Sequence, residues 1–149
     1  MIIRVQTEDF DINAVNRELL AGRSDVGAVA SFIGLVRDLE GDKLQQMTLE
    51  HYPGMTESAL QDIAERARQR WDIVDLGIIH RVGELAPSDQ IVLVTVLSAH
   101  RGDAFAACEF IMDYLKTEAP FWKKEVGEQG GNWVDARDSD DHALKKWKN

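Results

Sequence analysis

The sequence predicts an α+β fold in a single domain that spans residues 1–149. Apolar residues recur at helical spacing in three segments, whereas about seven other segments are short and apolar or alternating, as is typical of strands. Several of these strands follow one another across short turns, which favours a mixed or antiparallel sheet. No G-x-G-x-x-G or P-loop motif follows any strand, so a doubly wound nucleotide-binding fold is not expected.

The first third of the chain is expected to hold a strand, a helix and a second strand. Residues 1–5 form a short strand. Asp11 caps a helix that ends near Gly22 and places three apolar residues on one face: Ile12, Val15 and Leu19. The apolar run 26–36 is expected to be a buried strand, and the polar segment 37–45 a mobile loop.

The middle of the chain continues the alternation of strands and helices. Residues 46–52 alternate in polarity and form a strand that Pro53-Gly54 stops. A second helical stripe follows: Leu60, Ile63, Ala64, Ala67 and Trp71. Residues 73–82 and 90–98 are then expected to be strands, separated by a turn at 86–89.

The last third contains a third helix and a hairpin. The helical stripe consists of Phe105, Cys108, Met112 and Leu115, and it brings Lys116 to the C-terminal end of the helix. Strands 121–126 and 132–134 are expected to pair across the glycine-rich turn 127–131. Residues 138–149 are highly charged, which favours a mobile tail, whereas Trp147 favours an anchored segment.

Composition excludes several classes of protein. The net charge of −9 argues against sequence-independent binding of nucleic acid, which requires Lys and Arg to neutralise phosphates. No apolar run approaches the roughly 20 residues of a membrane span, and the N-terminal residues lack a signal-peptide pattern, so we expect a cytoplasmic protein. Cys108 is the only cysteine, which rules out a disulfide or a cysteine metal cluster within one chain.

The segment 116–124, Lys-Thr-Glu-Ala-Pro-Phe-Trp-Lys-Lys, has the most informative composition. It carries a charge of +2 in a protein whose remaining residues sum to −11. Pro120 ends a helix that arrives from Lys116 and makes Ala119 extended, so the segment is expected to form a rigid corner that leads into a strand carrying Lys123. Such a corner aims two ammonium groups at one anionic substrate. A solvated turn with core aromatic residues is the alternative that this segment alone leaves open.

The two lysines suit two chemical roles. A lysine that acts as a base or nucleophile needs a pKa near 8 rather than about 10.4, a shift that costs about 3 kcal/mol. Partial burial and a neighbouring cation are able to supply it. A charged lysine stabilises developing negative charge, or donates a proton, with no such shift. Both roles stay open.

Two further positions are suited to anion binding. His100-Arg101 follows the most apolar strand and precedes the third helix, where free backbone N–H groups and the helix dipole favour an anion. Arg37 likewise stands where an apolar strand runs into a loop. Ion pairs with nearby acidic residues are the alternative for both arginines: Asp103 or Glu109 for Arg101, and Asp38 or Glu40 for Arg37.

Other common catalytic motifs are absent from the sequence. It contains no G-x-S-x-G and no H-E-x-x-H, and its histidines (51, 80, 100 and 142) are too widely spaced for a local metal signature, so no metal site is expected. Cys108 falls in the apolar stripe of a helix and is expected to be an inert core thiol.

Several segments together resemble the large, catalytic subunit of molybdopterin synthase. They are Leu49–Met55 (LEHYPGM), Ile79–Leu85 (IHRVGEL), Ser98–Arg101 (SAHR), Asp113–Glu125 (DYLKTEAPFWKKE) and Trp133–Arg137 (WVDAR). The match runs in order from about Val26 to Arg137. The N-terminal 25 residues and the turn at 127–132 match poorly.

The resemblance implies a fold, a reaction and partners. The fold is the α/β hammerhead, and the assembly is a homodimer that binds two small ubiquitin-like sulfur-carrier subunits, which makes a heterotetramer. Each carrier inserts its C-terminal Gly-Gly tail as a thiocarboxylate. Two sulfur transfers to cyclic pyranopterin monophosphate (precursor Z) create the dithiolene of molybdopterin. Because the carrier supplies the sulfur, no further cofactor is expected.

The resemblance also assigns residues. Lys116 and Lys123 match the catalytic lysines, with Lys116 nearest the thiocarboxylate as general acid/base or charge stabiliser and Lys123 assisting proton transfer. The substrate-binding positions are Leu35 and Val36 (through their backbone), Arg37, His100, Arg101, Lys116, Lys123, Lys124 and Glu125. Arg137 is a weaker candidate. A homologue that binds pterin or carrier without catalysis, and a different anion-handling enzyme such as a phosphoester-binding acyl transferase, are the competing functions.

Overall fold

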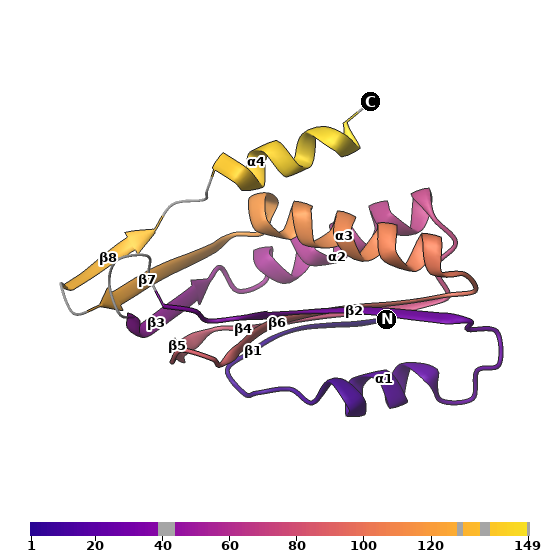
Figure 1. The fold of residues 1–149 in the computed structure, drawn as a ribbon, viewed down its shortest axis with the longest axis horizontal. Helices are drawn as coiled ribbons and strands as arrows, with labels where there is room; N and C mark the ends of the chain where they lie inside the picture. The colour runs from indigo at the N-terminus through magenta and orange to yellow at the C-terminus, as the bar shows by residue number, and fades with distance from the viewer. Residues whose placement is uncertain (39–43, 128–129, 135–137, 149) are drawn as a thin grey trace.

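The computed structural model describes the backbone of residues 1–38, 44–127, 130–134 and 138–148, and the side chains of these residues except 44–45, 124–127, 130–134 and 138–139. It contains two four-stranded sheets and four α-helices (Figure 1). The predicted α+β class is therefore confirmed. No helix in this described part is both long and apolar enough to cross a bilayer.

The first sheet has the order β1-β4-β6-β2. Its strands are β1 (Ile2–Gln6), β4 (Asp75–Arg81), β6 (Gln90–Ser98) and β2 (Ala28–Leu35). β1 runs parallel to β4, and the other neighbouring strands are antiparallel. The central strands β4 and β6 are buried along almost their whole length, because helices cover both faces of the sheet.

The helices form one layer on each side of this sheet. α2 (Met55–Arg70) and α3 (Arg101–Glu118) lie on one face, and α1 (Ile12–Leu20) lies on the other (Figure 1). α1 begins where predicted, since Asp11 Oδ1 accepts hydrogen bonds from the backbone N–H groups of Asn13 and Ala14 at 2.8 and 3.3 Å. The larger apolar core lies between the sheet and the α2/α3 layer, and a smaller one lies under α1.

The second sheet, at one end of the molecule, has the order β5-β3-β7-β8 and is antiparallel. It comprises β5 (Gly83–Leu85), β3 (Leu44–His51), β7 (Phe121–Gly127) and β8 (Gly130–Val134). The predicted hairpin is present as β7 and β8. The strand predicted over 73–82 ends at a sharp change of direction, because Gly83 adopts a φ of +90° and turns the chain out of the first sheet into the short β5.

The expectation that 26–36 is a buried strand is wrong for about half of its apolar residues. β2 is an edge strand of the first sheet, and Val29, Phe32 and Leu35 are 41%, 44% and 54% exposed. Ala30 is buried in the larger core and Ile33 packs against the smaller one, so the exposed residues lie on both faces of the strand. The apolar run therefore supplies residues to both cores and leaves other apolar side chains exposed along the open edge of the sheet.

The C-terminal residues pack against the helical layer. They form α4 (Asp138–Leu144) and the 3₁₀ helix η1 (Lys145–Trp147). The indole of Trp147 contacts Trp71 and Phe110 edge-on, with ring centroids 5.6 and 5.5 Å apart, and its Nε1 donates a 2.6 Å hydrogen bond to Asp113. The sequence left open a mobile tail or an anchored segment, and these contacts correspond to an anchored segment.

Candidate functional site

The corner predicted around Pro120 is present and is fastened to α2. Ala119 is extended, with φ −79° and ψ 128°, and the N–H of Phe121 donates to the Ala119 carbonyl at 2.9 Å. The hydroxyl of Thr56, which is fully buried, donates to the Pro120 carbonyl at 2.9 Å and accepts from the N–H of Tyr52 at 3.0 Å. The exit of α3, the start of α2 and the end of β3 therefore meet at one point.

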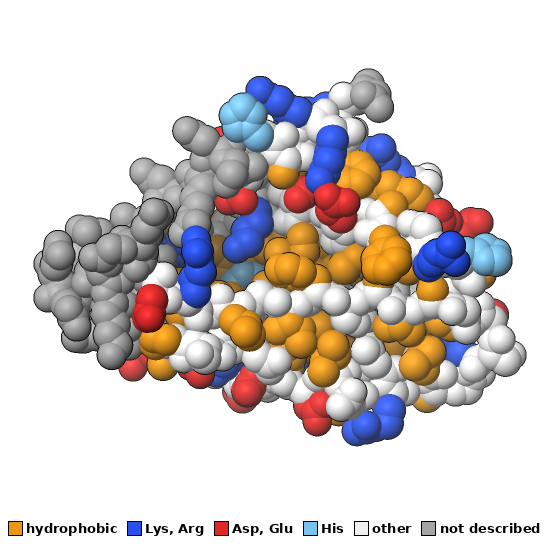
Figure 2. Space-filling view, viewed as in Figure 1, with side chains coloured by type: hydrophobic (Ala, Val, Ile, Leu, Met, Phe, Trp, Pro, Cys, Tyr) orange, Lys and Arg blue, Asp and Glu red, His pale blue; other side chains and the backbone are white. Residues whose placement is uncertain are grey.

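Lys116 stands in the last turn of α3, where the helix dipole favours a cation. It borders a groove of about 510 Å³ between β2 and α3. Most residues lining the groove are apolar, and the full set is Ala30, Ser31, Phe32, Phe105, Cys108, Glu109, Met112, Asp113 and Lys116. Figure 2 shows the hydrophobic side chains gathered on this face, with Lys or Arg side chains and a histidine in the hollow at one end of the patch. The groove therefore places apolar side chains of β2 and α3 beside Lys116.

Lys123 follows on the strand that leaves the corner. It lies opposite Leu49 of β3 and Val134 of β8 and is half-buried. Successive side chains of a strand alternate, so Lys123 shares the face of β7 that carries Phe121, whereas Trp122 points the other way and is exposed. Phe121 packs against the body of the protein. Lys116 therefore precedes Phe121 in the last turn of α3, and Lys123 follows it on the same face of β7.

His80 lies beneath this corner, and sequence reasoning did not select it. Its ring stacks on Phe121, with centroids 3.8 Å apart and an interplanar angle of 18°. The pKa of His80 is lowered to about 4, mainly by burial, with smaller contributions in the same direction from the charges of Lys116 and His51, whereas the hydrogen bond with the Arg81 backbone raises it. A single histidine in an apolar strand is typical of a core, so nothing in the sequence was a reason to select His80. The spacing of the sequence also gives no sign that His80 contacts Phe121.

Leu35, Val36 and Arg37 lie where β2 ends near the second sheet. Val36 is buried in the cluster that contains Met47 and Leu49 of β3, and its N–H donates to the Asp89 carbonyl at 2.9 Å. Leu49 is the register partner of Lys123. The exposed Arg37 therefore leaves the first sheet near the strand pair that carries Lys123. The expected loop 37–45 lies largely outside the described residues, and 44–45 belong to β3.

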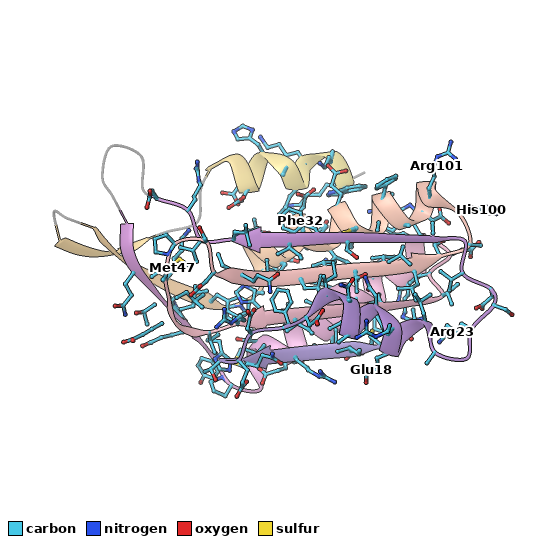
Figure 3. All side chains as sticks on the ribbon, turned by 60° about the horizontal axis from the view of Figure 1, so that its bottom comes forward. Glu18, Arg23, Phe32, Met47, His100 and Arg101 are labelled. Carbon is cyan, nitrogen blue, oxygen red and sulfur yellow. The ribbon has the colours of Figure 1, made fainter. Side chains whose placement is uncertain are left out.

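The structure does not bring His100 and Arg101 to Lys116 within one chain. His100 is the N-cap of α3 and Arg101 its first residue, so fifteen residues separate Arg101 from Lys116, or about 22 Å of helix. Figure 3 shows both side chains at the far end of the molecule from Met47 of β3, and Arg101 points away from the body. In the described part of the chain Arg101 forms no ion pair with Asp103 or Glu109, and Glu109 pairs with Lys146 instead.

The remaining predicted positions are described only in part. The backbone of Lys124 and Glu125 lies in β7, opposite Thr48 and Met47, and their side chains are outside the described residues, as is all of Arg137. Cys108 is buried, and burial raises the pKa of its thiol to about 11, so it is protonated at neutral pH. Among the described residues, no three His, Cys, Asp or Glu side chains are grouped so as to hold a metal ion.

This arrangement is suited to chemistry on an anion. The corner is rigid, the neighbouring groove is apolar, and ammonium groups in such surroundings interact with negative charge more strongly than in bulk water. The described side chains at the corner offer proton donors but no nucleophilic thiol or serine.

Comparisons with known proteins identify the family. A family model described as "MoaE protein" matches residues 5–118. The chain is 64% identical over 146 residues to the molybdopterin synthase catalytic subunit of Ralstonia nicotianae, covering 97% of this chain and 83% of that one. It superposes with a TM-score of 0.86 and 57% identity on the molybdopterin biosynthesis MoaE protein of Burkholderia ambifaria, covering 99% and 98% of the two chains. Molybdopterin synthase of Staphylococcus aureus matches with a TM-score of 0.81 and 34% identity over 88% and 95% of the chains. Since the family model, the close sequence relatives and the solved structures all agree, this chain belongs to the MoaE family.

Proposed function

We propose that this chain is the catalytic subunit of a molybdopterin synthase and that its reaction takes place at the Pro120 corner. It takes sulfur from the thiocarboxylated C-terminus of a small ubiquitin-like carrier and delivers it to cyclic pyranopterin monophosphate. The observation that carries the proposal is the placement of Lys116 at the end of an apolar groove, with Lys123 on the same face of β7 as the stacked Phe121.

Each sulfur transfer needs charge stabilisation and proton transfer. A carbon–sulfur bond forms on the pterin side chain, an oxygen substituent leaves the same carbon, and water then cleaves the acyl–sulfur bond of the carrier, which departs as a carboxylate. Lys116 stabilises the thiocarboxylate and donates a proton to the departing oxygen, and Lys123 holds the intermediate and assists proton transfer. The buried, protonated Cys108 takes no part, so the carrier is the sulfur source and no further cofactor is proposed.

The phosphate of the substrate requires its own cations. Arg37 leaves the first sheet beside the strands that carry Lys123 and is proposed to grip this phosphate, together with the backbone at Leu35 and Val36. Lys124 and Glu125 follow Lys123 in β7 and are proposed to line the same wall. His100 and Arg101 lie too far away in the same chain to join them.

In a dimer, His100 and Arg101 of one copy can lie near Lys116 of the other copy. β2 is an edge strand with an open side, and along this edge and the neighbouring surface of α3 four apolar residues are exposed: Val29, Phe32, Leu35 and Phe105. A two-fold dimer through this face pairs the same surface on both copies. It can set the two α3 helices antiparallel, so that His100 and Arg101 of the second copy lie near Lys116 of the first. This homodimer is the proposed core of a heterotetramer with two carriers.

The test is a defined assay with cyclic pyranopterin monophosphate and thiocarboxylated carrier. The chain is expected to yield dithiolene product, and Lys116→Ala is expected to abolish it while the complex with the carrier still assembles. Lys145→Ala, which removes an exposed lysine of η1, is the matched control and retains full activity. Normal turnover by Lys116→Ala would refute the assigned role.

The same assay separates the competing functions. A binding module without catalysis would bind pterin or carrier and give no product. An acyl transferase acting on another phosphoester would consume a different substrate. We place the reaction in the cytoplasm, because reducing conditions there suit a thiocarboxylate donor.

A further inference from the structure

His80 joins the two sheets directly below the proposed site. It belongs to β4 of the first sheet, where its register partners are Val5 of β1 and Val92 of β6. Its ring nevertheless stacks on Phe121, the first residue of β7 in the second sheet. Because Phe121 directly follows Pro120, this single ring contact helps to set where β7 starts relative to the end of α3.

The hydrogen bond of the ring defines its tautomer. Nδ1 of His80 lies 2.8 Å from the carbonyl oxygen of Arg81. A carbonyl oxygen only accepts, so Nδ1 carries the hydrogen, and Nε2 of the neutral ring keeps a lone pair. The side chain is 5% exposed, and the ring therefore presents a hydrogen-bond acceptor in a nearly water-free position.

The groups around the His80 ring favour its neutral form. Two described titratable side chains act on it from other elements, Lys116 from α3 and His51 from β3, and both oppose a positive charge on the ring. On its own strand, the guanidinium of Arg81 is occupied by the Thr7 and Gln90 carbonyls. Val5 and Val92 are apolar. A lysine has three donors and no acceptor, so an uncharged acceptor nearby favours its charged form.

We propose that His80 is a positioning residue for sulfur transfer: its uncharged imidazole, stacked on Phe121, fixes the corner between Lys116 and Lys123 and leaves Lys116 as the charged group at this end of the groove. This inference rests on the proposed function. A phenylalanine at position 80 would keep a stacking ring but lose both nitrogens. A glutamine would keep an amide donor for the Arg81 carbonyl and an acceptor oxygen.

The experiment compares these two replacements in the defined sulfur-transfer assay, with the carrier complex intact. His80→Phe is expected to lower kcat by about tenfold or more with little change in KM, because the ring loses its hydrogen bond to the Arg81 carbonyl and the acceptor that favours a charged Lys116. A catalytic group that is misplaced or wrongly charged slows the chemical step more than binding. It is also expected to shift the pH profile of kcat. His80→Gln is expected to keep kcat within about threefold of the unmodified protein and to show the same pH profile of kcat as that protein. His142→Phe, at an exposed histidine of α4, is the matched control.

A merely structural role gives a different pattern. In that case both variants lower the melting temperature, and the folded fraction of each retains the kcat and pH profile of the unmodified protein, which overturns the inference. If His80→Phe does not fold, Phe121→Leu removes the stacking contact itself from the other side. A kcat about tenfold lower with little change in KM then supports the inference, and an unchanged kcat overturns it. Absence of product with the unmodified chain overturns the proposed function itself, and the inference with it.

Discussion

The hydroxyl of Thr56 donates a 2.9 Å hydrogen bond to the carbonyl of Pro120, sixty-four residues further along the chain. The same hydroxyl accepts from the N–H of Tyr52, so one buried side chain links the end of β3, the start of α2 and the corner that carries Lys116. The position of the proposed site therefore depends on a residue that is not itself expected to touch substrate.

Thr56→Val tests this link. Valine has nearly the same shape but cannot bond the Tyr52 N–H or the Pro120 carbonyl, both of which are partly buried, so the free energy of unfolding is expected to fall by about 1–3 kcal/mol, as measured by urea denaturation. Thr56→Ser retains the hydroxyl and is expected to stay closer to the unmodified protein. A valine variant as stable as the serine variant would show that the hydrogen bonds contribute nothing.

The titration of His80 predicts a loss of stability in acid. Its pKa is about 4 in the folded protein against an ordinary value of 6.5. Between these two values the unfolded chain binds more protons than the folded one, so the free energy of unfolding falls as the pH drops from about 6.5 to about 4. The full loss from this residue is about 3 kcal/mol.

Denaturation curves between pH 7 and pH 4 measure this effect. His80→Gln has no titrating group at the position and is expected to show a shallower decline over that range, with His142→Phe as the control for loss of an exposed histidine. Parallel curves for the unmodified protein and His80→Gln would contradict a depressed pKa in the fold.

Phe105→Asp tests the proposed dimer face. Phe105 is 66% exposed on α3, so the substitution is expected to leave the free energy of unfolding of one chain within about 0.5 kcal/mol. A charge buried without a partner in the interface is costly, and the protein is expected to sediment as a monomer. Gln69→Asp introduces the same charge on the exposed side of α2 and is expected to remain dimeric. Dimeric Phe105→Asp would place the interface elsewhere.

Mixing two inactive variants tests whether the site is shared between copies. Lys116→Ala and Arg101→Ala are each expected to be inactive as homodimers. In a two-fold dimer a mixed pair has one site with both changes and one with neither, so refolding equal amounts together is expected to restore about a quarter of the full rate. No recovery of product would mean that Arg101 does not act on the Lys116 of a second copy.

Local rules account for the parts of the fold that the sequence predicted well. Asp11 caps α1 and Pro120 ends α3 because both effects act within a few residues, and the turn-containing β7–β8 hairpin is equally local. The three-residue β5 was missed because it is too short to show a periodicity. The exposed apolar residues of β2 were not predicted, because an apolar run in the sequence does not show whether each side chain packs within the same chain or lies on the surface.

The candidate site was predictable at its centre and less so at its edges. The charge and the proline of segment 116–124 sufficed to indicate the corner and its two lysines. The separation of Arg101 from Lys116 follows from the rise of a helix, about 1.5 Å per residue, and can be calculated from the sequence positions alone. The role of His80 cannot, because its contact with Phe121 joins two sheets across forty-one residues of sequence.

The unbroken helix α3 fixes the separation between Arg101 at its start and Lys116 in its last turn, the two residues proposed to act on substrate. One inserted residue in its middle would displace one end by about 1.5 Å and rotate it by about 100° relative to the other. In a symmetric pair such an insertion would misalign both reaction centres at once. Length variation is therefore expected to be tolerated in the loops around α3 and not within it.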